Sequence, residues 1–117
     1  IVSDKSEKFL LKEIMREKLL LKFDKEIPHG VAIVLNEYKI RPSGTAEVNL
    51  DIICEKQNHK AILIGKQGAA LKEVSSFARE GMEKFLGRKV FLTVFVKVKE
   101  NWRDNPALLS EFGYKEQ

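Results

Sequence analysis

The chain has 117 residues, which is the size of one ordinary domain. It is 44% hydrophobic and 32% charged, so its composition excludes intrinsic disorder and allows a buried core. The net charge is +4, a mild excess of base that favours an acidic partner without identifying one. The single cysteine, Cys54, excludes an internal disulfide, favours a reducing compartment, and has no Cys/His cluster around it that predicts a zinc site.

The chain carries no sign of a membrane span or a secretory signal. No apolar run approaches the roughly 18 residues that cross a bilayer. The first residues, Ile1 to Asp4, contain neither an initiator methionine nor a signal-peptide pattern. We therefore expect residues 1–117 to form a single domain that is a fragment of a longer protein.

The first half of the chain predicts a helix followed by a β-hairpin. Residues 4–22 carry apolar side chains at helical spacing, with lysines on the opposite side. Strands are predicted at 31–40 and 46–55, and the turn chemistry of 41–44 joins them. In the second strand apolar and polar residues alternate, and only Ile53 breaks the period of two.

The second half predicts two helices, a strand and a last short helix. The expected elements are helix 59–64, helix 69–86, strand 89–99 and a helix ending at Phe112. Asn58 and Asp104 are the expected N-caps of the first and last of these helices. The complete order predicts an α+β fold with a three-stranded sheet and helices packed on one face.

A glycine-bounded loop, Gly65-Lys66-Gln67-Gly68, separates the two central helices. Glycine lets the backbone turn sharply and approach a sugar-phosphate chain closely. The helix that follows directs its free N–H groups and the positive end of its dipole toward the same space. Two glycines at this spacing are common, so the loop alone is equally compatible with a simple corner between helices.

The charge around this loop favours a nucleic acid. The stretch from Lys56 to Lys72 has four lysines and no acid, and the stretch from Arg88 to Lys99 has four bases and no acid. Basic stretches beside a glycine clamp suit a phosphate backbone. The alternative is an ordinary solvated face of lysines.

The runs IGKQGAALKEV, KVFLTVFVKVKE and NWRDNPALLSEFGY resemble the C-terminal KH domain of the Era family of GTPases, and so does the opening segment. The resemblance implies a type II KH domain of αββααβ order, plus a short C-terminal helix. KH domains clamp about four nucleotides with a GXXG loop. The resemblance implies three partners. The first is single-stranded RNA from the 3′ region of small-subunit ribosomal RNA, the second is the small ribosomal subunit during its assembly, and the third is the GTPase domain of the same chain.

The resemblance also implies a cytoplasmic protein with weak peripheral membrane association. No GxxxxGK[ST] phosphate loop occurs, so we expect this fragment to be non-catalytic, to bind no GTP and to need no cofactor. The RNA-binding residues that we predict are Gly65, Lys66, Gln67, Gly68, Ile62, Ile64, Lys60, Lys72 and Arg79. Bases are expected between the two central helices and the second strand, whose polar groups would read them.

Two other functions remain open. One is a KH domain of another type II family, which the tail motif argues against. The other is a protein-interaction domain that regulates a GTPase without binding nucleic acid. Phe91 and Phe95 lie opposite the valine face of the third strand. Three roles are open for them: stacking on bases, covering the sheet, or packing against a GTPase domain. His29 and His59 have no companion acid of a catalytic or metal site, so we expect His29 to be a turn residue and His59 to be a surface residue near the RNA. Trp102 is expected to anchor the tail.

Overall fold

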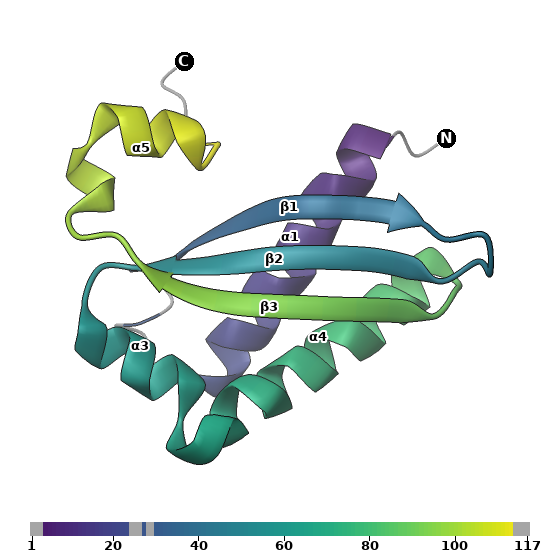
Figure 1. The fold of residues 1–117 in the computed structure, drawn as a ribbon, viewed down its shortest axis with the longest axis horizontal. Coiled ribbons are helices and arrows are strands. Elements are labelled where there is room, and N and C mark those ends of the chain that lie inside the picture. The colour runs from purple at the N-terminus through teal and green to yellow at the C-terminus, as the bar shows by residue number, and fades with distance from the viewer. Residues whose placement is uncertain (1–3, 24–26, 28–29, 114–117) are drawn as a thin grey trace.

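The computed structural model describes residues 4–23, 27 and 30–113. In chain order the elements are α1 (Asp4–Lys22), β1 (Ala32–Ile40), β2 (Ala46–Cys54), α3 (Gln57–Ile64), α4 (Ala69–Leu86), β3 (Val90–Val98) and α5 (Pro106–Glu111), with 3-10 turns at Lys66–Gly68 and Trp102–Asp104. This order confirms the predicted α+β fold with its short C-terminal helix (Figure 1).

The central strand of the sheet is β2, because the strand order is β1-β2-β3. β2 pairs antiparallel with β1 through the predicted hairpin and parallel with β3. The pairing with β1 shifts between Leu35 and Glu37, which leaves Asn36 as a bulge. β1 and β3 are therefore the two edge strands of this sheet.

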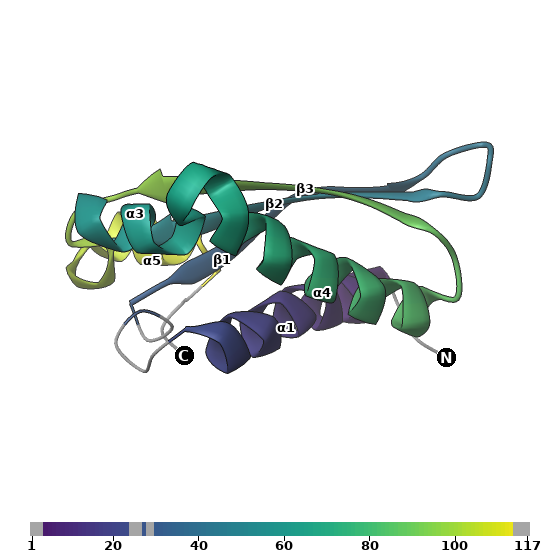
Figure 2. The same ribbon diagram turned by 90° about the horizontal axis from the view of Figure 1, so that it is seen from below.

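The main core lies between one face of the sheet and the long helices α1 and α4 (Figure 2). Alternate side chains of β2 point toward this face, as the sequence pattern predicts. Fully buried side chains from the three elements are Leu11, Met15, Leu19, Val48, Leu50, Ile52, Val74, Ala78 and Met82. Cys54 is also buried in this core.

Gly81 in the middle of α4 lets α1 pack closely against it. A Cβ atom at Gly81 would lie 3.0 Å from Cγ2 of Ile14 and 3.7 Å from Cε of Lys18. Toward the start of α4, Lys22 forms an ion pair with Glu73. Since glycine costs about 1 kcal/mol in a helix interior, the close approach of the two helices explains a residue that helix propensity disfavours.

The tail packs on the opposite face of the sheet and forms a second core. Trp102 is 3% exposed and contacts Phe112 edge-to-face, with ring centroids 5.7 Å apart. Both rings pack with Ala32 and Ile53. The structure thus confirms that Trp102 anchors the tail, and it explains Ile53, whose side chain is covered by the tail although it breaks the alternation of β2.

Two predicted helix caps are wrong. α5 is capped by Asn105, whose Oδ1 accepts hydrogen bonds from the N–H groups of Ala107 and Leu108, while Asp104 lies in the preceding 3-10 turn. α3 begins at Gln57 with Lys56 as its N-cap, so Asn58 lies inside the helix. In both cases the cap is one or two residues from the predicted one, because several polar residues precede each helix. His29 lies outside the described residues.

Candidate nucleic-acid interface

Gly65 is the residue that the loop between α3 and α4 cannot replace. Its φ of 76° and ψ of 179° fall in a region that is essentially restricted to glycine. A Cβ atom there would lie 2.6 Å from Cβ and 2.9 Å from the backbone N of Ala70. Gln67 and Gly68 follow with φ of 55° and 79°, so three of the four loop residues adopt positive φ. The loop backbone therefore turns tightly against the start of α4.

The N-terminus of α4 is open to an anion. Its N-cap is Gly68, no side chain caps the helix, and the first turn contains no acidic residue. The first N–H groups of an 18-residue helix therefore keep their positive potential. Lys66 and Gln67 are exposed beside this helix end. The predicted phosphate clamp thus has donors that no side chain of its own already occupies.

The lysines around the loop are not paired with acids of the described residues. Lys60, Lys66 and Lys72 form no ion pair within the part of the chain that the structure describes. Away from the loop, Arg41 and Lys97 pair with Glu47 and Asp51. Positive charge is therefore uncompensated at the loop, where a phosphate backbone would lie.

The apolar residues beside the loop, namely the predicted Ile62 and Ile64 and the neighbouring Leu71, differ in accessibility. Ile62 is 48% exposed, next to the fully buried Leu63. Ile64 and Leu71 are partly buried and pack against the main core. Of this set, Ile62 offers the largest apolar surface to a ligand, while the other two chiefly hold α3 and the start of α4 on the sheet.

Arg79 lies on the side of α4 that faces β3. Lys72, Ser75, Arg79 and Glu83 share one side of the helix by their spacing, and we call this side the α4 flank. Gly81 lies nearly opposite Arg79 around the helix and contacts α1. Glu83 accepts a hydrogen bond from Nη1 of Arg79 at 2.9 Å and another from the N–H of Val90 at 2.9 Å. The α4 flank is thereby directed toward β3.

The expectation that main-chain groups of β2 read bases is wrong, because both sides of β2 are bonded to neighbouring strands. Of the two edge strands, β3 is the one that contacts both α3 and α4. The carbonyl of Lys89 bonds to Ala46, and the N–H of Lys99 bonds to Cys54 at the end of β2. The main-chain N–H and C=O groups of successive residues in a strand point to opposite edges, so those of the odd-numbered residues of β3 face β2. The main-chain groups of Leu92, Val94 and Val96 consequently point away from the sheet. The strand order was not predicted from the sequence, because the pattern of a single sequence does not say which strands pair.

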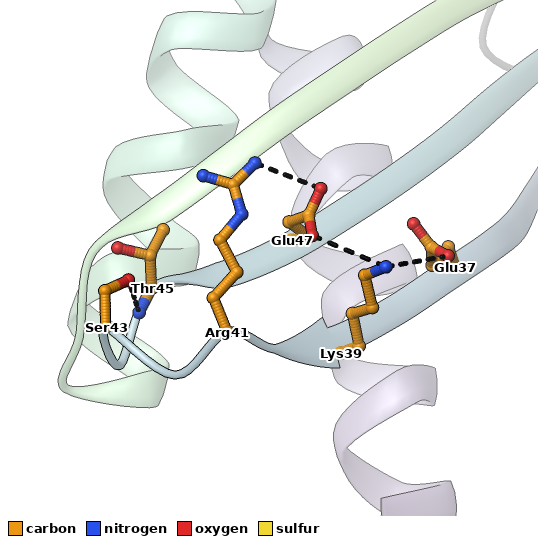
Figure 3. A network of polar contacts seen from close by, with 6 residues as sticks. All are labelled: Glu37, Lys39, Arg41, Ser43, Thr45 and Glu47. Carbon is orange, nitrogen blue, oxygen red and sulfur yellow. Dashed lines mark hydrogen bonds and ion pairs between the residues drawn. The ribbon is translucent and has the colours of Figure 1, made fainter.

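The face of the sheet that carries Phe91 and Phe95 is open and electrically balanced. The two rings are 54% and 53% exposed. The Arg41 guanidinium lies 4.9 Å from the ring centre of Phe91 and also pairs with Glu47 at 3.0 Å. Figure 3 shows the ion pair of Arg41 with Glu47 and the neighbouring residues Lys39 and Glu37 at the hairpin. The hydrogen bond from Arg41 lowers the pKa of Glu47 below its ordinary value.

His59 lies in the first turns of α3 and is partly buried, not fully on the surface. Its Nδ1 atom is buried without a hydrogen-bond partner among the described residues.

Burial raises the pKa of the Cys54 thiol, which makes this thiol a poor nucleophile. Within the described ranges, no three or more His, Cys, Asp or Glu residues gather as metal ligands do. No described helix is both long and apolar enough to span a membrane.

The sequence is 50% identical to GTPase Era of Clostridium kluyveri over 115 residues, a match covering 98% of this chain and 39% of that protein. GTPase Era of Clostridium botulinum is 46% identical with the same coverage. Both matches confirm the resemblance that the GKQG loop and the tail predict. The chain spans less than half the length of these relatives.

Solved structures give the same result. Aquifex aeolicus Era bound to GDP and AlF4⁻ matches with a TM-score of 0.84 at 38% identity, covering 92% of this chain and 36% of that chain. Era in complex with MgGDPNP and nucleotides 1506–1542 of 16S ribosomal RNA matches with a TM-score of 0.85, the same identity and the same coverage. The profile of a family described as KH domain matches residues 26–103. That match covers the hairpin, the glycine loop and β3, and this chain belongs to the KH domain family.

Proposed function

We propose that this domain binds single-stranded RNA across the GKQG loop, between the α4 flank and the free edge of β3. The observation that carries the proposal is that Lys60, Lys66 and Lys72, around the uncapped N-terminus of α4, form no ion pair with any described residue. A helix N-terminus with no acid in its first turn attracts phosphate, and each lysine adds a counterion-releasing contact. Some cations elsewhere in the domain, such as Arg41 and Lys97, are engaged with acids.

Each part of this surface has a distinct role in the proposal. Gly65 and Gly68 let the sugar-phosphate chain approach the loop backbone, and Lys66 follows it with a mobile charge. Ile62 supports a base by apolar contact. The main-chain groups of Leu92 and Val94 offer donors and acceptors to base edges, as an edge strand does to any extended partner.

We further propose that the RNA is the 3′ region of small-subunit ribosomal RNA and that the domain acts in small-subunit assembly. The support is the similarity to Era, one structure of which is in complex with nucleotides 1506–1542 of 16S ribosomal RNA. The fold of this chain matches that structure over 92% of its length with a TM-score of 0.85. The RNA sequence would be selected at the β3 edge, since phosphate contacts position a strand without reading it.

The domain would be the non-catalytic RNA-binding part of a cytoplasmic GTPase, requiring no cofactor of its own. Two facts support this: the relatives are GTPases of which this chain covers 39%, and GxxxxGK[ST] is absent from its sequence. Weak peripheral association with a membrane fits the exposed side chains of Leu21 and Phe77, which line a hollow of about 520 Å³ with Lys18 and Lys22. Both lysines are paired with acids, Lys18 with Glu17 and Lys22 with Glu73, so the exposed apolar side chains are what support this association.

The proposal is tested by fluorescence anisotropy with a labelled single-stranded RNA taken from nucleotides 1506–1542 of 16S ribosomal RNA. The matched control is the same RNA annealed to its complement. We expect the single strand to bind more tightly than the duplex and to lose affinity steeply with salt. Equal binding of strand and duplex, or none at low salt, contradicts the proposal.

A protein-interaction domain is the second candidate function, favoured by the open face around Phe91 and Phe95. Exposed aromatic rings beside Arg41 resemble the anchors of protein interfaces. The acids on this face are paired with bases, so it offers a phosphate chain little net charge. Absence of RNA binding in the titration above would leave this face as the better candidate.

A further inference from the structure

We infer that Glu83 is a positioning residue that sets where the bound RNA strand ends on this domain, an inference that rests on the proposed RNA-binding function. Its carboxylate bridges the two walls of the proposed site. Oε1 accepts from Nη1 of Arg79 on the α4 flank, and Oε2 accepts from the N–H of Val90 at the start of β3, both at 2.9 Å. One side chain thus ties the helix to the strand.

The first consequence concerns the free edge of β3. Val90 is the first residue of the strand, and alternation places its N–H on the same edge as those of Leu92, Val94 and Val96. Glu83 already occupies the Val90 N–H. An RNA strand can therefore use the edge only from Leu92 onward. The carboxylate caps this end of the edge strand.

The second consequence is electrostatic. Glu83 carries a negative charge on the same flank as Lys72, about three turns farther along α4. The loop end of this flank is basic and uncompensated, whereas farther along the flank Glu83 neutralises Arg79. Phosphates are therefore attracted more strongly at the loop than at Arg79. The N–H of Val90 and the guanidinium of Arg79 lower the pKa of Glu83, which keeps its charge at neutral pH.

The third consequence is that Arg79 is held in place. Its side chain is 40% exposed, yet its guanidinium is bonded to Glu83 and cannot extend freely. Glu83 holds Arg79 against the β3 side of the helix. The bound strand then runs from the loop toward Arg79 and stops before Glu83.

The test uses nested, labelled RNAs cut from nucleotides 1506–1542 of 16S ribosomal RNA, each lengthened at either its 5′ or its 3′ end. The protein variants are Glu83→Gln, which keeps an oxygen acceptor for Val90 but removes the charge, and Glu80→Gln, which makes the same charge change on the exposed side of α4. Thermal melting shows that each variant is folded. The measured quantity is the ratio of the affinity for a longer RNA to that for a shorter one.

We expect Glu83→Gln to raise this ratio by about two- to fivefold for extension at one end only, as removal of one like charge at a surface predicts. Glu80→Gln should leave the ratio at the wild-type value. A purely structural role of Glu83 would change the affinity for every RNA by one factor and leave the ratio unaltered, and that result overturns the inference. Failure of the wild type to bind any of the RNAs overturns the proposed function as well, so the two failures are distinguishable.

Discussion

The Cα atom of Gly65 faces Ala70 so closely that a Cβ atom on Gly65 would lie 2.6 Å from the Cβ of Ala70. Gly68 has a similar φ, but a Cβ atom there would meet nothing within 4 Å. The two glycines of the loop are therefore required for different reasons. At Gly65 both the backbone angles and the space exclude a side chain, whereas at Gly68 the left-handed backbone angles only disfavour one.

This difference predicts unequal effects on stability. Gly65→Ala should lower the free energy of unfolding by about 2–4 kcal/mol, from backbone strain plus a steric overlap. Gly68→Ala should cost only about 1 kcal/mol. Denaturant titration of both variants measures the difference. Adding Ala70→Gly should rescue part of the Gly65→Ala loss, and strictly additive costs in that cycle would contradict the steric explanation.

The loop side chains should matter for RNA and not for folding. Lys66→Asp with Gln67→Asp places two negative charges at the phosphate site, where acids at the N-terminus of α4 are favourable by about 0.3–1 kcal/mol each. We expect unchanged or slightly higher stability and a loss of RNA affinity of more than about tenfold. Thermal melting and fluorescence anisotropy measure the two quantities.

The matched control for this double variant is Lys5→Asp with Asn101→Asp. It makes the same total change of charge, and Asn101 has a φ of 56°, like the 55° of Gln67. Lys5 lies in the first turn of α1, so it reproduces the new acid at a helix start. Equal loss of RNA affinity in both variants would mean that overall charge, and not the loop, determines binding.

The unpaired lysines predict the salt dependence of binding. Each phosphate neutralised on a single strand contributes about −0.7 to the slope of log affinity against log salt, so three or four contacts give a slope of about −2 to −3. Lys72→Ala should make the slope less steep by about 0.7. Lys84→Ala, near the far end of α4, should leave it unchanged, and an equal effect of both substitutions would contradict the proposed path of the RNA.

The tail should stabilise the domain without touching RNA. Trp102→Ala removes a ring that is 3% exposed and packs on Phe112 and Ile53, so we expect a loss of about 3 kcal/mol or more in the free energy of unfolding. Phe95→Ala removes a half-exposed ring and should cost much less. Chemical denaturation compares them, and an unaltered transition for Trp102→Ala would show that the tail is loosely attached.

The hairpin ion pair predicts a contribution to acid sensitivity. The Arg41 hydrogen bond lowers the pKa of Glu47 in the folded protein below its ordinary value of 4.5. The resulting stability is fully present above that ordinary value and disappears as the pH falls through the lower, folded pKa. Glu47→Gln should therefore make the unfolding free energy less dependent on pH in this acidic window. An identical pH profile for Glu47→Gln and wild type would exclude the contribution.

Sequence alone determined the element order, because strand alternation, helical spacing and the glycine loop are local patterns. It also located the loop from Gly65 to Gly68, which contains Lys66, and it predicted that Trp102 anchors the tail. The cap Asn105 escaped it because the neighbouring Asp104 is equally suited to cap a helix, and Lys56 escaped it because its side chain makes no cap hydrogen bond.

Only the tertiary structure decided which strand is available to a ligand. The parallel pairing of β2 with β3 places β2 in the centre, and this pairing joins segments that two helices separate along the chain. Long-range packing likewise explains Gly81, which faces Ile14, and Ile53, which lies under Trp102. The bridge from Glu83 to Val90 follows from the same packing, since no periodicity of sequence relates the side of a helix to the first N–H of an edge strand.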